Sequence, residues 1–285
     1  PLPILQRLRD EFLVTALCDV SPQVLAGVGA SVPSAALYMD VGQMIAEAPV
    51  DAVLVANPHA LHADTALSAI AAGKHVLVEK PLCLTLEEAD ALSAAAGAAN
   101  VIVQVGYMRR CAPGFIEAVE QVVPLRGAVR HARFQDVIGN TSAIVNSAGS
   151  VLRAADIPPE ESRRIEAIAK QRLHSLHGSA AEPLPNVYSM LLGLGSHDLS
   201  AMRELLGMPQ GVLYAAQNTD GRYLSAAFDY GNYVADFVAG VDNLPRYDTF
   251  CEIFTDDQVI RVSFDAPYIL NQPARLRVTT ADGEA

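Results

Sequence analysis

Polar side chains at the ends of apolar runs are the first candidates for chemistry in this sequence. The runs end in Asp19, in Asn57-Pro58-His59, in Glu79-Lys80-Pro81 and in Tyr107-Met108-Arg109. Ligands of parallel α/β sheets bind outside the carboxyl ends of the strands. One polar strand end is commonplace, but several in register predict a single ligand pocket at one edge of a sheet.

Asp19 has the position of a ribose-binding acid in a doubly wound fold. A carboxylate there accepts hydrogen bonds from both adenosine ribose hydroxyls and repels a 2′-phosphate. The alternative is a plain strand-end Asp before a helix that starts at residues 21–23 (SPQ). No GxGxxG glycine loop accompanies it, since residues 27–31 read GVGAS and the Gly pair at residues 193–198 (GLGSHD) lies inside an expected helix.

Apolar runs that alternate with helix-like segments predict a parallel sheet in the first part of the chain. The runs lack polar alternation, which is typical of strands covered on both faces. The expected strands are residues 12–20, 51–58, 75–81 and 101–107. The expected helices are residues 41–48, 62–73 and 85–99. Thr85 and Glu88 have the spacing of a capping box at the start of the last of these helices.

The pattern changes near residue 107, where we expect a domain boundary. Residues 128–139 alternate with period two, and short runs joined by turn signals follow further on. These runs are residues 211–218, 223–230, 232–241, 249–255 and 258–264. Helix-like segments lie at residues 158–178 and 186–209. We therefore predict an α/β Rossmann-like parallel-sheet domain over residues 1–107 and an α+β domain with a largely antiparallel open-faced sheet over residues 108–285.

Composition and charge narrow the range of partners. The chain has 285 residues and a formal net charge of −12, with a sequence pI near 4.9. This charge argues against nucleic acid and anionic membranes, but a small phosphorylated ligand can still be held locally. The cysteines are far apart and form no CxxC, which indicates a reducing compartment. No apolar run reaches the roughly 18 residues of a membrane span, so we expect a cytoplasmic protein.

Two other kinds of site have little support in the sequence. His59 and His62, like His174 and His177, have helical spacing, but no carboxylate or Cys completes either pair as a metal site. A serine hydrolase of the elbow type would need a GxSxG motif, which the sequence lacks. We therefore predict no metal.

Residues 56–82, ANPHALHADTALSAIAAGKHVLVEKPL, resemble the signature of the glucose–fructose oxidoreductase and inositol dehydrogenase family (Gfo/Idh/MocA). Members carry an N-P-x-x-H-type strand end and then an AGKHVxxEKP segment. The similarity is close over residues 50–90. It continues through the YMRR stretch at residues 107–110 and the GSHD segment at residues 195–198.

The resemblance implies a catalytic role for Lys80. In that family the Lys of EKP points at the reacting carbon beside the nicotinamide, and the Lys–Pro bond is typically cis, so we expect a cis Lys80–Pro81 bond. The residues that the resemblance places at the cofactor are Asp19, Ala56, Asn57, Pro58, His62, Glu79, Lys80 and Arg109. Family members also begin with a strand and a glycine-rich turn and end with a further strand and helix. We therefore expect this sequence to be truncated at both ends.

The second signature of the family is Asp-x-x-x-His on a helix of the second domain, and His197 matches its His. Residues i and i+4 share one helix face, so the Asp would orient the imidazole. Here the Asp position falls on Gly193, and Asp198 faces elsewhere on an α-helix. The relay of Lys, Asp and His is therefore incomplete. The alternative for His197 is a core residue of a Leu-rich helix.

The predicted function is an NAD(P)-dependent oxidoreductase that acts on a sugar, inositol or related polyol. His197, helped by Lys80, would take the hydroxyl proton as hydride leaves, and Lys80 would also stabilise the developing oxyanion. Tyr107 and Arg109 would line the nicotinamide and substrate side. The residues expected at the substrate are Lys80, Tyr107, Asp136, Asn140 and His197.

NAD is the expected cofactor rather than NADP, because Asp19 would face the 2′ position of the ribose. Gly193 motivates an alternative, a regulatory protein that senses a ligand or NAD on the same fold without turnover. A further possibility is that the truncated chain binds no dinucleotide. We also expect a homo-oligomer that forms through the sheet of the second domain, whose strands are rich in Val, Phe and Tyr.

Overall fold

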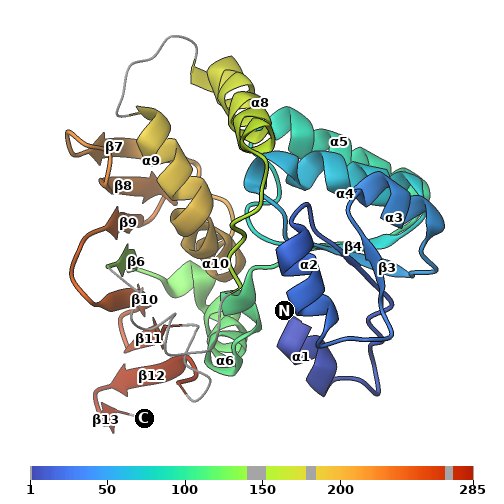
Figure 1. Cartoon of the computed structure of the whole chain (residues 1–285). Coiled ribbons are helices and arrows are strands. Elements are labelled where there is room, and N and C mark those ends of the chain that lie inside the picture. Colours follow the sequence, from blue (N-terminus) through green and yellow to red (C-terminus); the bar gives the residue numbers. More distant parts are fainter. Residues whose placement is uncertain (1, 140–151, 178–183, 267–271, 285) are drawn as a thin grey trace. The chain divides into compact units, whose positions relative to one another are not determined.

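The computed structural model describes residues 2–139, 152–177, 184–266 and 272–284, which form two compact units. The first unit comprises Pro1–Gly106 and Val151–Leu176, and the second comprises Tyr107–Ser150 and His177–Ala285 (Figure 1). Each unit has a hydrophobic core of its own.

The first unit contains parallel strands, as the uninterrupted apolar runs predicted. The strands are β1 (Ala16–Cys18), β2 (Ala36–Tyr38), β3 (Ala52–Val55), β4 (His75–Val78) and β5 (Val103–Val105). β1 pairs with β2, while β3, β4 and β5 form a separate sheet in that order. The sequence did not indicate β2, because two of its three residues are exposed and it therefore does not form a buried apolar run.

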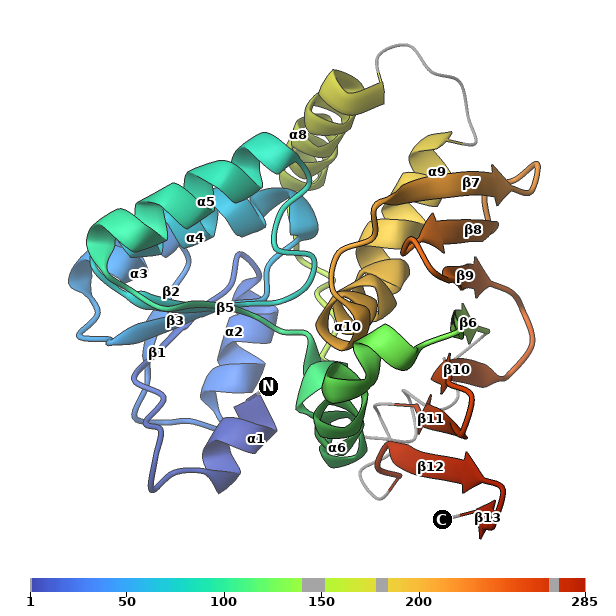
Figure 2. The same cartoon turned by 180° about the vertical axis from the view of Figure 1, so that it is seen from behind.

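Helices cover both faces of the strands of the first unit. They are α1 (Leu2–Arg7), α2 (Pro22–Gly29), α3 (Val41–Glu47), α4 (His62–Ala71), α5 (Leu86–Ala99) and α8 (Pro159–His177), with the 3-10 turn η1 (His59–Leu61) before α4. Figures 1 and 2 show α3, α4 and α5 on one face and α1 and α2 on the other. Ala66 and Ala69 of α4 are fully buried, so this helix packs closely against β3 and β4.

The segment Val151–Leu176 belongs to the first unit, whereas the sequence placed it in the second domain. Ion pairs explain the difference: Arg172 of α8 contacts Asp64 of α4 at 2.7 Å and Glu88 of α5 at 2.9 Å. The Arg172 guanidinium also donates to the carbonyl oxygen of Ala60. The polar pattern of α8 indicated a helix, but it could not show which unit the helix contacts, since Ala60 lies 112 residues away in sequence.

The second unit is built on an eight-stranded sheet, which confirms the predicted open, largely antiparallel architecture. Its strands are β6 (His131–Ile138), β7 (Gly211–Gln217), β8 (Tyr223–Asp229), β9 (Val234–Val241), β10 (Tyr247–Phe254), β11 (Gln258–Phe264), β12 (Arg275–Thr280) and β13 (Gly283–Glu284). Their order is β13-β12-β11-β10-β6-β9-β8-β7. β6 and β9 pair in parallel and the other neighbours are antiparallel. The first strand in sequence therefore lies in the middle of the sheet.

The described helices of the second unit pack on one face of this sheet (Figures 1 and 2). They are η2 (Met108–Cys111), α6 (Pro113–Val122), η3 (Val123–Ala128), α9 (Leu184–Met190), a π-helix (Leu191–Gly195) and α10 (Ser196–Leu206). The core between helices and sheet includes Phe115 of α6, Leu205 of α10, Phe134 of β6 and Phe237 of β9. Alternate residues of the strands supply it, as the period-two pattern predicted.

The opposite face of the sheet carries charged side chains above an aromatic ring. Phe250 of β10 is only 6% exposed, because the guanidinium carbon of Arg261 lies 3.8 Å from its ring centre. Glu252 pairs with Arg261 at 3.0 Å and with Arg133 at 3.4 Å. The cations of neighbouring strands therefore cover this phenylalanine.

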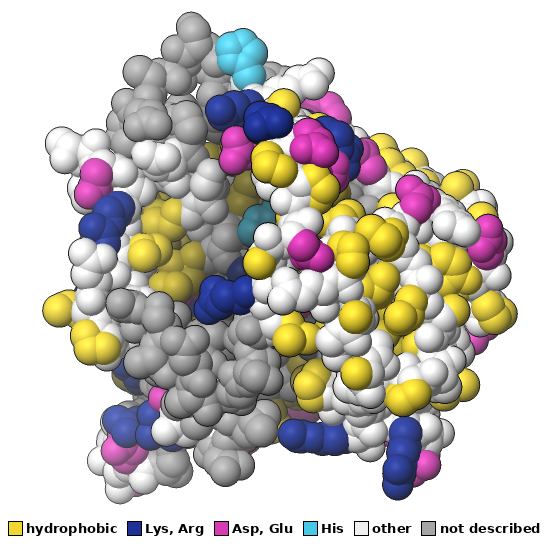
Figure 3. Space-filling model, viewed as in Figure 1, with side chains coloured by type: hydrophobic (Ala, Val, Ile, Leu, Met, Phe, Trp, Pro, Cys, Tyr) yellow, Lys and Arg dark blue, Asp and Glu magenta, His cyan; other side chains and the backbone are white. Residues whose placement is uncertain are grey.

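Apolar side chains are scattered over the surface of the first unit on the face drawn in Figure 3. Leu13 and Leu86 are among the most exposed of them. Scattered apolar groups of this kind are normal on the surface of a folded protein. Within the described ranges, no helix has both the length and the apolar character that crossing a membrane requires.

Candidate active site

The turn that carries Lys80 begins at the carboxyl end of β4. The strand pairing continues one residue past β4, because Glu79 N donates to the Val55 carbonyl oxygen at 2.8 Å. The Lys80–Pro81 peptide bond is cis, which confirms the expectation from the resemblance. The half-buried Lys80 thus follows a parallel strand at the end where ligands of such sheets bind.

His62 joins this turn to the segment that follows β3. Its side chain is 1% exposed, with Nδ1 at 2.7 Å from the Pro81 carbonyl oxygen and Nε2 at 2.8 Å from the Asn57 carbonyl oxygen. A carbonyl oxygen only accepts hydrogen bonds. A neutral imidazole can therefore donate to one of these oxygens, and an imidazolium can donate to both. His62 therefore links the turn after β4 to the segment after β3. A contact between His62 and the cofactor stays a prediction.

A capping box fixes the other end of the turn. Thr85 Oγ1 accepts from Glu88 N at 3.2 Å, and the Glu88 carboxylate accepts from Leu84 N at 2.8 Å and from Thr85 N at 3.2 Å. The predicted capping box is therefore confirmed. The same carboxylate pairs with Arg172, so α8 contacts the end of the Lys80 turn through one shared acid.

Asn57 provides a buried acceptor at the end of β3. Its Nδ2 donates to Thr65 Oγ1 at 2.8 Å, while its buried Oδ1 has no hydrogen-bond partner among the described residues. A buried acceptor without a donor costs free energy, so this position suits a ligand that brings an N–H or O–H group. Burial, with smaller contributions from His62 and Lys80, lowers the pKa of the nearby His59, which is therefore neutral at neutral pH.

The remaining cofactor residues predicted in the first unit also follow strand ends. Asp19 comes directly after β1, and its Oδ1 accepts from Ser21 N at 2.8 Å. The predicted residues that follow β1, β3 or β4 are Asp19, Ala56, Asn57, Pro58, His62, Glu79 and Lys80. These residues can hold a dinucleotide at the carboxyl ends of the parallel strands.

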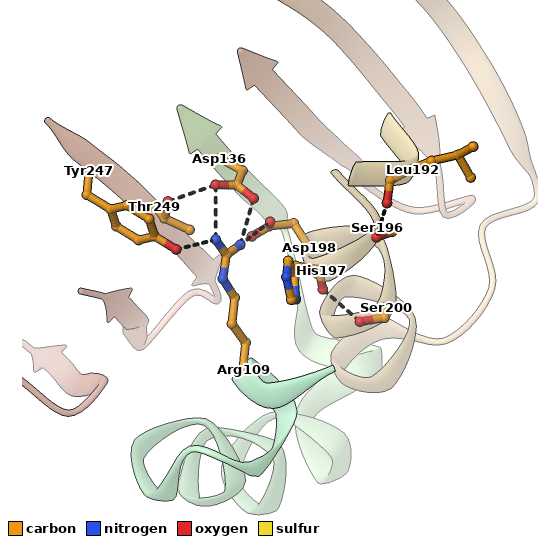
Figure 4. Close-up of polar contacts among 9 residues, drawn as sticks. All are labelled: Arg109, Asp136, Leu192, Ser196, His197, Asp198, Ser200, Tyr247 and Thr249. Carbon is orange, nitrogen blue, oxygen red and sulfur yellow. Dashed lines mark hydrogen bonds and ion pairs between the residues drawn. The ribbon is translucent and has the colours of Figure 1, made fainter. Parts of the chain in front are cut away.

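Arg109 differs from the other predicted cofactor residues, because it lies in the second unit within a buried ion cluster (Figure 4). Its guanidinium contacts the Asp136 carboxylate at 2.7 and 3.1 Å. It also donates to the Tyr247 hydroxyl at 2.7 Å and to the Asp198 carboxyl group. Thr249 Oγ1 donates to Asp136 at 2.9 Å. Arg109 and Asp136 thus contact one another, and their contacts with a cofactor or substrate stay predictions.

Burial makes the protonation of this cluster uneven. Burial opposes the charge of Asp136, but hydrogen bonding with Asp198 and the charge of Arg109 outweigh it and lower the pKa of Asp136. Burial raises the pKa of Asp198 well above its ordinary value, and the negative charge of Asp136 adds to this against the attraction of Arg109. Because the two pKa values shift in opposite directions, a proton on this cluster is held by Asp198 in preference to Asp136, which limits the cost of burying two carboxyl groups beside one guanidinium.

His197 lies on α10 and is 5% exposed. Its ring stands edge-on to Tyr107, with 6.2 Å between the ring centres. Figure 4 shows the Asp198 side chain directed at Arg109. The acid next to His197 in sequence therefore accepts a hydrogen bond from Arg109 in the ion cluster. This agrees with the expectation that Asp198 and His197 face different ways.

The helix before His197 is wider than the sequence suggested. Leu191–Gly195 form a π-helix between α9 and α10. A π-turn spaces its hydrogen bonds i→i+5, and such turns are frequent at functional sites. Gly193 and His197 are therefore not related by one regular α-helical turn, as the i, i+4 spacing assumed.

Sequence reasoning missed several polar residues that complete these groups. They are Arg172, Tyr247 and Thr249. Asp198 was considered only as a neighbour of His197, and Asp156, which accepts from Ser21 Oγ at the start of α2, was also missed. Thr249 stands on the core side of β10, and a polar residue at a core position is a usable signal of a buried partner.

The predicted substrate residue Asn140 lies outside the described residues. Within the described part of the chain, no cluster of His, Cys, Asp and Glu could hold a metal ion.

Parallel strands with polar carboxyl ends and helices on both faces define a Rossmann-type α/β unit, which is joined here to an α+β unit. Residues 2–107 match the Gfo/Idh/MocA family, described as an oxidoreductase family with an NAD-binding Rossmann fold. The family model thus covers the first unit up to residue 107, and the similarity to relatives extends over about three quarters of the chain.

Inositol 2-dehydrogenase 2 of Saccharopolyspora erythraea is 30% identical over 212 residues, which are 73% of this chain and 50% of that protein. The scyllo-inositol 2-dehydrogenase (NADP(+)) IolW of Bacillus subtilis is 25% identical over 75% of this chain and 53% of that protein. The chain thus spans about half the length of these curated relatives. The solved scyllo-inositol dehydrogenase of Lactobacillus casei with NAD(H) and scyllo-inositol has the same fold, with a TM-score of 0.66 at 19% identity over 95% of this chain and 73% of that one.

Proposed function

We propose that the protein containing this chain is an NAD-dependent oxidoreductase that transfers hydride between nicotinamide and a carbinol carbon of an inositol, sugar or related polyol. The observation that carries the proposal is Lys80 at the carboxyl end of β4. The turn around it is held by His62 on one side and by Glu88 on the other. Relatives named as inositol dehydrogenases support the choice of polyol substrates.

The first unit has polar groups that fit a dinucleotide. The Asp19 carboxylate can accept hydrogen bonds from the ribose hydroxyls. The Asn57 Oδ1 acceptor is buried without a partner in the described structure and can accept from an amide or hydroxyl of the ligand. When bound, nicotinamide supplies the hydride acceptor or donor.

Oxidation of an alcohol also requires that its hydroxyl proton leave, and two side chains of this chain are assigned to that proton. The imidazole of His197 accepts it, and the ammonium group of Lys80 stabilises the negative charge that develops on the oxygen. Asp198 does not replace the acid that the family places before His197, because its carboxyl group is engaged by Arg109.

The preference for NAD over NADP rests on the charge of Asp19. A carboxylate beside the ribose accepts from the 2′-hydroxyl, whereas a 2′-phosphate in its place is repelled by about 1–4 kcal/mol per pair of unit charges at 4 Å. The name of the Bacillus subtilis relative includes NADP(+), so related proteins do not share one cofactor. Residues near the 2′ position must therefore set the choice.

A polyol panel tests the activity. The full-length gene product is incubated with NAD and with inositols, sugars and sugar alcohols, and the absorbance of the reduced nicotinamide is followed. We expect reduction of NAD with at least one polyol and a lower kcat/KM with NADP. Binding of NADH without turnover of any polyol would contradict the proposal in favour of the regulatory alternative, which neither the fold nor the relatives named above favour.

The expected homo-oligomer and cytoplasmic location belong to the same proposal. The sheet face that carries Phe250, Arg133, Glu252 and Arg261 is the surface proposed for the subunit contact. Light scattering on the full-length protein tests this part. A monomer at micromolar concentration would count against it, whereas a dimer that dissociates on Phe250→Asp substitution would support it.

A further inference from the structure

Asp156 occupies the amino end of α2 in the first unit, although it lies 135 residues from Ser21 in sequence. Its Oδ1 accepts from Ser21 Oγ, and its Oδ2 accepts from Gln23 N at 2.8 Å. Gln23 Oε1 in turn accepts from Ala155 N at 3.4 Å. The carboxylate of Asp156, from a segment distant in sequence, thus accepts hydrogen bonds from Ser21 Oγ and Gln23 N at the start of α2.

The same helix end also contacts Asp19. Ser21 is the N-cap of α2 and accepts from Val24 N at 3.0 Å through its hydroxyl oxygen. Its backbone N donates to Asp19 Oδ1 at 2.8 Å. Ser21 therefore stands between two carboxylates, Asp19 through its main chain and Asp156 through its side chain.

If the first unit binds a dinucleotide as proposed, these groups lie near the 2′ position of its ribose. In a Rossmann unit, a strand-end acid, the role predicted for Asp19, binds the 2′-hydroxyl of NAD. NADP needs a cation or free donors at that place for its 2′-phosphate. The amino end of a helix and a serine hydroxyl are donors that suit a phosphate. Here Asp156 engages both of these donors and adds a negative charge beside them.

We propose that Asp156 is a specificity-determining residue which, together with Asp19, excludes the 2′-phosphate of NADP by occupying the donors at the start of α2 with a carboxylate. The inference rests on the proposed function, since it presumes that the first unit binds a nicotinamide dinucleotide. It extends that function, because Asp156 comes from the segment before α8 and not from the strand end that carries Asp19.

The charge of Asp156 is present at neutral pH. Hydrogen bonds from the Ser21 side chain and from Gln23 N lower its pKa below the usual range of an aspartate. The side chain is exposed, so dissolved salt screens its charge. The exclusion of NADP should therefore weaken as ionic strength rises, which a purely steric exclusion would not do.

A structural role alone would give a different result. If Asp156 only fastened its segment to α2, its loss would lower stability and weaken both cofactors equally. If it also repels the 2′-phosphate, its neutral variants should bind NADPH more tightly while the affinity for NADH stays nearly constant. The ratio of the two dissociation constants therefore separates the two roles.

The test compares Asp156→Asn and Asp156→Ala with Asp90→Asn, which removes the same charge at an exposed position of α5. Titrations of the full-length protein that follow nicotinamide fluorescence give Kd for NADH and NADPH at low and high salt. For the Asp156 variants at low salt we expect Kd of NADPH to fall by about tenfold and Kd of NADH to change by less than about twofold, since one unit charge several ångströms from a phosphate acts on this scale. For Asp90→Asn we expect no change in the ratio.

The outcomes separate this inference from the proposed function. Unchanged NADPH-to-NADH ratios in both Asp156 variants, with NADH still bound, would overturn the role of Asp156 and leave the oxidoreductase proposal intact. Failure of the wild-type protein to bind NADH would contradict the proposed function and this inference with it. If Asp156→Ala unfolds, Asp156→Asn decides the question, because asparagine keeps the shape and one oxygen acceptor. Titration with adenosine 2′,5′-bisphosphate against AMP should show the same change in ratio.

Discussion

The Nδ1 atom of His62 lies 2.7 Å from the carbonyl oxygen of Pro81, so a helix that follows β3 fixes the turn that follows β4. The other ring nitrogen contacts the Asn57 carbonyl oxygen. One buried imidazole thus sets the distance between two segments that we assign to the cofactor.

Replacement of His62 by Ala should weaken both folding and cofactor binding. It removes the ring nitrogen that donates to a buried carbonyl oxygen, and an unsatisfied buried group costs about 1–3 kcal/mol. Urea unfolding gives the stability, and titration with NADH gives Kd, which should rise. His174→Ala, at an exposed position of α8, is the control. Equal unfolding midpoints for the two variants would show that the His62 contacts contribute little.

Replacement of Lys80 by Ala should reduce rate far more than stability. The side chain is half-buried at a strand end, so the free energy of unfolding should change by less than about 1 kcal/mol. Loss of proton-transfer help and of oxyanion stabilisation should lower kcat by roughly 10²–10⁴. Steady-state kinetics on the full-length enzyme measure this, with Lys170→Ala on α8 as control. The catalytic role fails if the variant keeps more than about a tenth of kcat while NADH binding is intact.

The carboxyl groups of Asp136 and Asp198 should respond differently to the same substitution. Asp136→Asn removes the ionised partner of a buried guanidinium and should destabilise the protein by about 3–5 kcal/mol. Asp198→Asn replaces a carboxyl group whose raised pKa favours its neutral form, so it should destabilise the protein less than Asp136→Asn does. Urea unfolding of both variants checks the order. Equal losses would show that both groups are ionised.

Acid should reveal the same difference through the slope of stability with pH. The lowered pKa of Asp136 means that its contribution is present above the ordinary aspartate value of about 3.9 and is lost as pH falls through the lowered value. The raised pKa of Asp198 has the opposite sign, since its contribution is present at low pH and is lost as pH rises above about 3.9. Relative to wild type, Asp198→Asn should therefore gain stability as pH rises from about 4 towards neutrality. Unfolding curves across this range test the sign.

Replacement of Arg172 by Met should loosen α8 from the first unit. Methionine keeps most of the side-chain length but cannot contact Asp64, Glu88 or the Ala60 carbonyl oxygen. Partly exposed ion pairs contribute about 0–1 kcal/mol each, and their joint loss should accelerate hydrogen exchange in residues 159–176 and in residues 84–88. Arg163→Met, exposed on the same helix, is the control. Unchanged exchange in both segments would mean that apolar contacts alone hold α8.

Local signals were sufficient to predict most elements of the fold. Uninterrupted apolar runs predicted β3 and β4, and the spacing of Thr85 and Glu88 predicted the start of α5. Both features depend only on residues that are close in sequence. The three-residue strand β2 and the π-helix were not predicted, since neither has a periodic pattern of its own.

The candidate site divides in the same way. Strand-end residues such as Asp19 and Lys80 follow from the order of elements and from the family resemblance. The partners of Arg109 could not be found from the sequence, because Asp198 lies 89 residues away and Tyr247 lies 138 residues away. Asp156 could not be distinguished in the sequence from other loop aspartates, because its partner Ser21 lies 135 residues away. Long-range pairing of charges requires the three-dimensional structure.

The division of the chain also has a consequence for its synthesis. The first unit includes Val151–Leu176, so it is formed from two separate stretches of the sequence. The central strand β6 of the second unit lies between these stretches and is synthesised before the first unit is complete. Until residues 159–177 have been synthesised, the first unit lacks α8, and Asp64 and Glu88 have not yet met Arg172. Since domains generally fold as units while they emerge, this one must wait for α8, and chaperones have that interval in which to bind it.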